Sequence, residues 1–270
     1  MKKIANFSQT YKVIEQFTWG ATGHDREYLI DFLIKDTNTI NLRKLLDLHT
    51  FNFHNYRPEE TLSIRNKINS VIPTTFSAFY NCTYGYSFLK HIEFLKEQGI
   101  TDILWIQDDE FCIHDNFEDI KNIFEFYKQR DDIKSLCLRL AKSTLDKNGT
   151  VITTDDIGED INSNIKIYKT TSQDSDTYDR HGFPSGGLLC DINIIYNMLT
   201  CNKHIIQTTN AYELERYMCK YGIQNNIQRC VLSQPIIKVF NITGMGGSIG
   251  GSEENLNFLN KKFNTDISYK

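Results

Sequence analysis

The sequence predicts an α/β fold in which a central, mostly parallel sheet is flanked by helices. Three observations support this prediction. The run 103–106 consists of large apolar residues, as in a strand that is buried on both faces. Segments with helical periodicity precede and follow this run. A second apolar run, 135–140, then completes a strand–helix–strand unit, whose crossover is expected to be right-handed.

The remaining elements follow from the period of apolar residues along the chain. The pattern predicts helices at 26–34, 63–70, 84–98, 117–129 and 192–199, with two more beginning near 211 and 252. Strands are expected at 3–7, 46–53, 103–106, 135–140 and 166–169, and a strand or extended loop at 75–81. Pro235 restricts the segment 231–240 to an edge strand or an extended segment.

Capping residues define the ends of several helices. Gly99 suits the position just after a helix carboxyl terminus, and Asn116 suits an N-cap. Asn210 is also a good N-cap, with Glu213 three residues later as in a capping box. These signals predict sharp boundaries for the helices around the central run.

Composition limits the classes of function. The 270 residues suffice for one large α/β domain, and no linker divides them. We therefore expect a single domain over 1–270, with a nucleotide-binding half at about 1–140 and an acceptor-binding half at about 141–270. The net charge of −4 and the scattered Lys and Arg argue against a nucleic-acid surface.

Hydropathy and cysteine usage bear on the compartment. No stretch approaches the ~20 apolar residues of a transmembrane helix, and the first residues do not resemble a signal peptide. The seven cysteines include no C-x-x-C pair, which is typical of small core residues in a reducing environment. These features predict a cytoplasmic protein without a transmembrane segment.

Three adjacent acids, Asp108, Asp109 and Glu110, follow the buried run directly. In open α/β sheets, ligands bind at the carboxyl ends of the strands. Adjacent carboxylates are suited to a hard divalent cation such as Mg²⁺ or Mn²⁺, which prefers oxygen ligands. The acids therefore predict a metal site that would clamp a diphosphate. The alternative interpretation is a solvated loop after a strand.

Small polar residues follow the first predicted strand, at the same edge of the sheet. They are Ser8, Gln9, Thr10 and Tyr11. At this position they are expected to contact a nucleotide base or ribose, and a plain polar turn is the alternative.

The order of these features resembles the glycosyltransferases of the GT-A fold, a single Rossmann-like domain. The shared features are a helix, the segment 102–111, a second helix, the pair Gly186-Gly187 and an acidic helix start. The resemblance implies a nucleotide-sugar donor, with UDP as the default, and a hydroxyl acceptor. It places the metal on the acids that correspond to the DxD motif, namely Asp108, Asp109 and Glu110, and leaves open which two of them ligate it. The first two are also expected to bind the donor.

The resemblance also implies an acceptor side and, in inverting members, a base. Gly186 and Gly187, with His181 before them, correspond to the acceptor-side glycine loop. Many inverting members carry a Glu-Asp pair at the start of the next helix, where this chain has Asn210-Ala211. The candidate catalytic residues are therefore Glu213, Glu215 and Asp191, and whether the reaction inverts or retains stays open.

Other functions compatible with the sequence are a nucleotidyltransferase and a GT-A-like protein that binds nucleotide sugars but is catalytically impaired. A nucleotidyltransferase would usually show a glycine-rich basic loop after the first strand, and residues 8–12 do not form one. Ala211, in place of an acid, favours the impaired protein. A purely structural role explains the sheet but not three acids at its carboxyl edge.

Overall fold

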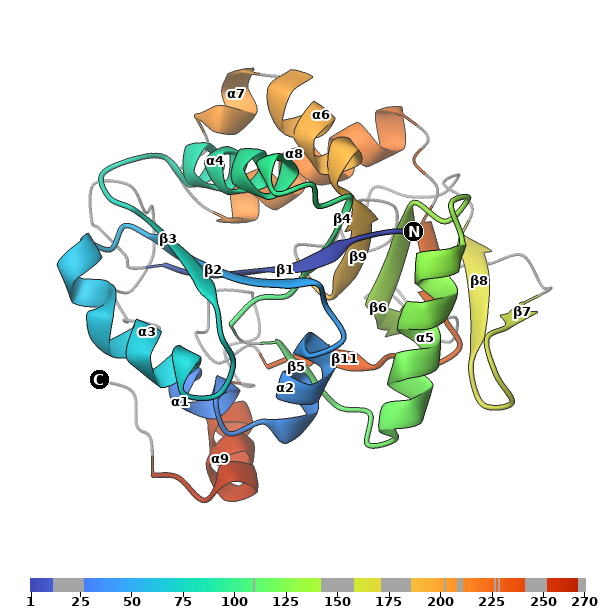
Figure 1. Ribbon diagram of the computed structural model, residues 1–270, viewed down its shortest axis with the longest axis horizontal. Helices are drawn as coiled ribbons and strands as arrows, with labels where there is room; N and C mark the ends of the chain where they lie inside the picture. Colours follow the sequence, from blue (N-terminus) through green and yellow to red (C-terminus); the bar gives the residue numbers. More distant parts are fainter. Residues whose placement is uncertain are drawn as a thin grey trace.

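A computed structural model shows how these segments are arranged (Figure 1). It describes residues 1–11, 27–108, 110–141, 158–170, 186–201, 203–207, 211–225, 227, 229–240 and 252–266.

The strands alternate with helices through most of the chain. The strands are β1 (Ile4–Tyr11), β2 (Leu48–His54), β3 (Thr75–Phe79), β4 (Asp102–Trp105), β5 (Glu110–Cys112), β6 (Ser135–Ala141), β7 (Glu159–Asp160), β8 (Lys166–Thr170), β9 (Leu188–Asp191), β10 (Arg229–Leu232) and β11 (Ile237–Val239). The helices are α1 (Glu27–Leu33), α2 (Thr37–Arg43), the short 3₁₀ helix η1 (Pro58–Thr61), α3 (Leu62–Asn69), α4 (Tyr84–Glu97), α5 (Phe117–Gln129), α6 (Ile192–Cys201), α7 (Lys203–Ile206), α8 (Ala211–Gln224) and α9 (Ser252–Phe263).

Nine of the described strands form one sheet in the order β3-β2-β1-β4-β9-β6-β10-β8-β7. Strands β3, β2, β1 and β4 are mutually parallel, as are β6 and β10. Strand β9 runs antiparallel to both β4 and β6, so these two strands point the same way. The carboxyl ends of all the parallel strands therefore meet at one edge. The predicted α/β fold with a mostly parallel, helix-flanked sheet is confirmed.

Helices cover both faces of the sheet (Figure 1). In the upper layer of the view, α4, α6 and α8 pack on Phe7 and Trp105, which project from β1 and β4. Phe88 of α4 meets Phe7 edge to face, with ring centroids 4.4 Å apart. In the lower layer, α2 and α5 pack on Ile4 and Leu104, which lie on the same two strands and project from the opposite face of the sheet. Because side chains alternate between the two faces along each strand, each strand contributes to two separate hydrophobic cores.

The helix boundaries around β4 agree with the predicted caps. Helix α4 begins after Thr83, an N-cap that the sequence analysis did not name and whose hydroxyl accepts a hydrogen bond from the Tyr86 N–H. It ends just before Gly99, which has the left-handed φ of +72°. Asn116 caps α5 by accepting from the Glu118 N–H over 3.1 Å. Because these signals are local, they were readable from the sequence.

Several elements differ from the prediction. Strand β9 and helix α2 were not predicted. The acidic strand is shorter than expected, because β4 ends at Trp105 and a separate strand, β5, begins at Glu110. The segment expected to be one extended or edge strand over 231–240 instead holds two strands. Strand β10 lies inside the sheet between β6 and β8, and Pro235 falls in the connection to β11.

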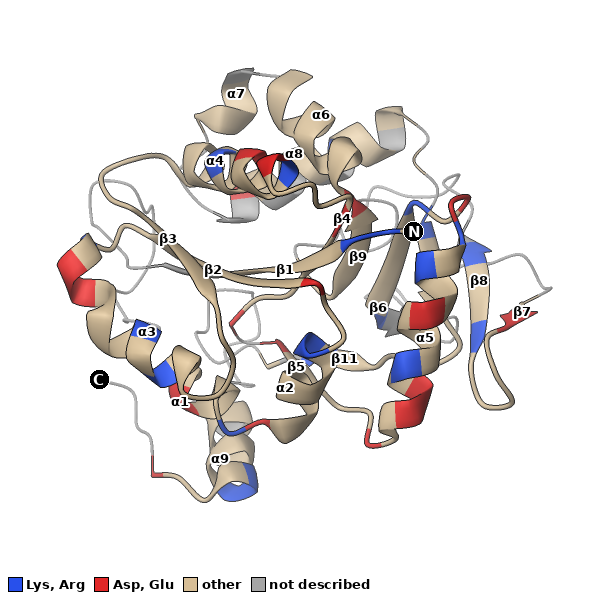
Figure 2. Cartoon of the chain, in the orientation of Figure 1, with Lys and Arg blue, Asp and Glu red and all other residues tan. Residues whose placement is uncertain are grey.

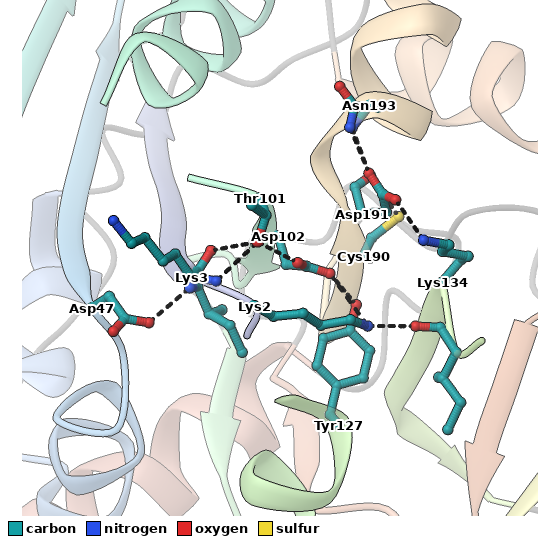
Figure 3. A network of polar contacts seen from close by, with 12 residues as sticks. Lys2, Lys3, Asp47, Thr101, Asp102, Tyr127, Lys134, Cys190, Asp191 and Asn193 are labelled. Carbon is teal, nitrogen blue, oxygen red and sulfur yellow. Dashed lines mark hydrogen bonds and ion pairs between the residues drawn. The ribbon is translucent and has the colours of Figure 1, made fainter. Parts of the chain in front are cut away.

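A buried polar network closes the amino edge of the sheet, opposite the acidic end (Figure 3). The Lys2 ammonium donates to the Ile133 carbonyl over 2.6 Å and lies 3.5 Å from Asp102. Tyr127 donates to the same Asp102 carboxylate over 2.8 Å. Burial lowers the pKa of Lys2 and raises that of Tyr127 well above its usual value. This network fastens the first residues of the chain to β4 and α5.

Acidic and basic residues are interspersed over the helices and loops drawn in Figure 2. Along α5, for example, Lys121 lies 3.5 Å from Glu118 and 3.9 Å from Glu125. Such exposed pairs are worth little individually. None of the helices among the described residues is long and apolar enough to cross a lipid bilayer.

Candidate functional site

The acidic segment lies at the carboxyl edge of the sheet, beside β1. Strand β4 pairs with β1 up to Trp105, which faces Phe7, and the Ile106 N–H then donates to the Phe7 carbonyl over 2.9 Å. Residues 103–106 are essentially buried, as predicted for a strand covered on both faces. Asp108 follows directly and is 1% exposed, while Asp109 lies outside the described residues. Asp108 therefore lies at the edge of the sheet where ligands bind in open α/β folds.

Glu110 differs from a freely exposed ligand, because its carboxylate is already engaged by other parts of the chain. Its Oε2 accepts hydrogen bonds from the N–H groups of Gln107, at 2.8 Å, and Gly187, at 2.9 Å. Its Oε1 lies 3.5 Å from Nη1 of Arg139. The residue is 1% exposed. Glu110 thus joins the end of β4, the start of β9 and strand β6.

The two predicted glycines lie against this carboxylate. A Cβ on Gly186 would overlap both oxygens of Glu110, so only glycine permits the observed approach. Gly187 has a left-handed φ of +56°, and a Cβ there would lie 3.0 Å from Cβ of Arg139. Its carbonyl accepts from the Leu138 N–H over 2.7 Å. The structure therefore brings the predicted acceptor-side glycines into direct contact with Glu110, one of the three predicted metal acids.

Arg139 is a site residue that the sequence analysis missed. Its side chain is 15% exposed and forms the ion pair with Glu110. The available signal was a lone cation in the otherwise apolar strand 135–141. A charge inside a buried strand needs a partner, and here the partner comes from a different strand.

Strand β11 brings a third part of the chain beside Glu110. It pairs antiparallel with β5, and Val239 lies opposite Glu110. The chain thus leaves β11 beside the acids and continues into the glycine-rich segment 241–251, which lies outside the described residues.

The four residues predicted to bind the donor, Ser8 to Tyr11, belong to strand β1 itself. The strand continues to Tyr11, so residues 9–11 are part of the sheet and not a turn after it. Their side chains lie outside the described part of the chain. The Ser8 side chain is fully buried, and its hydroxyl accepts from the Asn6 amide over 3.1 Å. The buried Ser8 hydroxyl is therefore not accessible to a ligand in this structure.

A buried polar network lies between α4 and the carboxyl halves of β2 and β3. His91 contacts the hydroxyls of Ser77, at 2.7 Å, and Thr50, at 2.8 Å. Burial lowers the pKa of His91 to about 3. Two buried atoms at this end of β2, Nδ2 of Asn52 and Oδ1 of Asn55, have no hydrogen-bond partner among the described residues. Since Asn52 is the register partner of Gln9, these amides adjoin the predicted donor residues.

One candidate base is corrected by the structure. Asp191 ends β9, and because β9 is antiparallel, its carboxyl end lies at the amino edge of the sheet, opposite Asp102. It pairs with Lys134 at 3.3 Å and accepts from the Asn193 N–H (Figure 3). The strand separates Asp191 from Gly187 by roughly 13 Å, at about 3.3 Å per residue. Asp191 is therefore not placed to act on a ligand at the acidic edge.

The other predicted bases belong to α8. Glu213 is exposed on the first turn of this helix. The Glu215 side chain lies outside the described residues. Before α8, the Ile206 carbonyl accepts a hydrogen bond from Thr83, the N-cap of α4. Since α4 follows the carboxyl end of β3, this contact brings the chain to the carboxyl edge only a few residues before α8 begins.

The remaining predicted residue, His181, falls in the segment 171–185, outside the described residues. Within the described ranges, no group of three His, Cys, Asp or Glu side chains is placed to hold a metal ion. Asp108 with Asp109 would supply two carboxylates, and sites that bind Mg²⁺ through substrate phosphates commonly need no more than that.

No protein-family model and no curated protein sequence matches the chain. Solved structures similar to it include residues 1–349 of S. aureus TarS, with 12% sequence identity, 98% of this chain and 67% of that chain covered, and a TM-score of 0.50. UDP-glucose pyrophosphorylase in complex with UDP-glucose has 12% identity, 97% and 100% coverage and a TM-score of 0.48. A putative glucose-1-phosphate thymidylyltransferase from Bacillus anthracis has 8% identity, 99% and 97% coverage and a TM-score of 0.48. At these identities, the comparison with TarS shows a shared Rossmann-like α/β fold and no more than the fold.

Proposed function

We propose that this protein is a metal-dependent glycosyltransferase that moves a sugar from a nucleotide-sugar donor to a hydroxyl acceptor. The observation that carries the proposal is the contact between the acidic end of β4 and the turn at Gly186 and Gly187. It joins the residues expected to bind the donor diphosphate to those expected to line the acceptor site. A solvated acidic loop gives no reason for this contact.

The charges at the acidic end support a divalent cation. The Glu110 carboxylate is paired with Arg139. Asp108 and Asp109 are the oxygen ligands in this proposal, and a divalent ion would balance their two charges. When bound, such an ion supplies electrostatic stabilisation of the departing nucleoside diphosphate.

The protein's own groups have separate roles in this proposal. Residues 9–11, with the unpartnered atoms Nδ2 of Asn52 and Oδ1 of Asn55, adjoin the place where the nucleoside would bind at the ends of β1 and β2. Glu213 or Glu215 would take the proton from the acceptor hydroxyl if the reaction inverts. If it retains, no such base is required. UDP is the default nucleotide, because UDP-sugars are the commonest donors of GT-A enzymes.

A product assay tests this proposal. The protein is incubated with Mn²⁺ and UDP-glucose or UDP-GlcNAc, and UDP release is followed by chromatography. UDP-GlcNAc is included because it is bound in a solved structure of TarS. Release that disappears in Asp109→Asn, but persists in the exposed control Asp131→Asn, supports a metal-dependent glycosyltransferase.

The same assay addresses the alternatives. A nucleotidyltransferase would instead release pyrophosphate from UTP and a sugar 1-phosphate. A catalytically impaired protein would bind UDP and Mn²⁺ without releasing a product. Pyrophosphate release would replace the proposed glycosyl transfer with nucleotidyl transfer. Binding without a product would replace it with a binding function.

A further inference from the structure

Glu110 is the point at which three strands meet at the acidic edge. Its Oε2 accepts from two backbone N–H groups, those of Gln107 and Gly187, and its Oε1 faces the Arg139 guanidinium. Gln107 immediately precedes the acids, Gly187 immediately precedes β9, and Arg139 lies on β6. The carboxylate therefore fixes the backbone of the acidic segment relative to the glycine turn.

The packing around this carboxylate is tight at both glycine positions. Gly186 lies so close to Glu110 that any side chain there would overlap both carboxylate oxygens. On the other side, Gly187 abuts the aliphatic part of Arg139, so that a Cβ added there would lie 3.0 Å from the Cβ of Arg139. Gly186 and Gly187 are thus packed directly against the two members of the ion pair, Glu110 and Arg139.

We infer that Glu110 is a positioning residue that fastens the glycine turn to the acidic end of β4, and not a metal ligand. A carboxylate that accepts two backbone hydrogen bonds and pairs with arginine would have to give up these partners to bind a cation. Breaking such a buried pair is costly. The metal part of this inference rests on the proposed function, whereas the fastening of the turn does not.

The first experiment asks which acids bind the metal. Mn²⁺ is titrated into the protein with UDP present, and its affinity is measured by calorimetry. The variant Glu110→Gln/Arg139→Gln removes both charges of the pair and leaves the net charge unchanged. We expect it to bind Mn²⁺ about tenfold more weakly than the unmodified protein, as for a group that positions the ligands, whereas Asp109→Asn loses on the order of 100-fold or more. A loss in the double variant as large as that in Asp109→Asn, in a protein whose near-ultraviolet circular dichroism is unchanged, would make Glu110 a ligand and overturn the inference.

The second experiment tests the fastening without metal or nucleotide. Urea unfolding is measured for Gly186→Ala, for Glu110→Asp and for the two combined. The shorter Asp withdraws its carboxylate from the turn, so it should relieve the overlap with the added methyl group. We expect the combined variant to have a urea midpoint at or above that of Gly186→Ala alone. Additive decreases in the midpoint would show that the two residues are not coupled, and would overturn the inference.

The two experiments separate failure of this inference from failure of the proposed function. If the unmodified protein binds neither Mn²⁺ nor UDP, the proposed function fails, and the unfolding cycle still decides the role of Glu110 in holding the turn. If it binds both, the affinities of the charge-neutral pair variant and of Asp109→Asn decide which carboxylates ligate the metal.

Discussion

Asp102 and Asp191 are register partners in the antiparallel strands β4 and β9, and each carboxylate faces its own lysine. The Asp102 carboxylate lies 3.5 Å from Lys2, and both side chains are buried. The Asp191 carboxylate lies 3.3 Å from Lys134, whose side chain is 52% exposed. Two ion pairs at the same edge of the sheet therefore differ in burial, and Asp102 also accepts hydrogen bonds from Tyr127 and Thr101.

This difference gives a prediction for stability. Asp102→Asn leaves the Lys2 ammonium buried without its counter-charge and should lower the free energy of unfolding by about 3 kcal/mol. The matched change Asp191→Asn should cost less than about 1 kcal/mol, because water solvates the exposed Lys134. Urea unfolding measures both. Equal losses in the two variants would show that burial does not set the strength of these pairs.

The same pair of variants tests the correction of Asp191. Since this residue lies at the edge opposite the acids, Asp191→Asn should bind UDP and Mn²⁺ as the unmodified protein does. Loss of binding in a folded Asp191→Asn protein would return Asp191 to the functional site.

Gly187→Ala should destabilise the protein more than Gly99→Ala. Both glycines have a left-handed φ, of +56° and +72°, which costs an alanine about 1 kcal/mol. A methyl group at Gly99 meets nothing within 4 Å, whereas one at Gly187 presses against Arg139. Overpacking adds about 1–3 kcal/mol to the cost at Gly187. Thermal unfolding of the two variants compares the costs, and equal shifts would contradict the described contact.

Two buried histidines should make the protein sensitive to acid. Burial lowers the pKa of His54 to about 4 and that of His91 to about 3. Both stay neutral in the folded protein, while in the unfolded chain they take up protons below about pH 6.5. Their contribution to stability is therefore complete above pH 6.5 and is lost progressively as the pH falls toward their folded pKa values. Each should cost about 2 kcal/mol between pH 7 and pH 5.

Urea midpoints at pH 7 and pH 5 check this prediction. Substituting the buried residue, as in His91→Asn, removes one of the two groups, so the variant should lose less stability on acidification than the unmodified protein. The exposed control His204→Asn should retain the full loss. An unchanged loss in His91→Asn would mean that other groups determine the acid sensitivity.

The sequence predicted what depends on local signals. Helices α4 and α5 were found because capping residues and apolar periodicity lie within the elements themselves. The buried strand before the acids was found because it is covered on both faces. Strand β9 was missed, because the short run 188–191 becomes a strand only by pairing with β4 and β6.

The limits of the site prediction have the same origin. The direction of β9 cannot be read from its sequence, and that direction moves Asp191 to the wrong edge of the sheet. The partners of Glu110 come from Arg139, 29 residues away, and Gly187, 77 residues away. The motif of three consecutive acids leaves open which of them ligate a metal, and only the tertiary contacts show that the Glu110 carboxylate is held by distant parts of the chain.

The central claim is a metal–diphosphate site that includes Asp109. It is tested most directly by thermal shift with UDP, GDP and their sugar derivatives, with and without Mn²⁺, on the unmodified protein, Asp109→Ala and the control Asp131→Ala. The account predicts a stabilisation that requires both the metal and Asp109 and is retained in Asp131→Ala. No shift with any nucleotide, or a shift that Asp109→Ala retains, would contradict it.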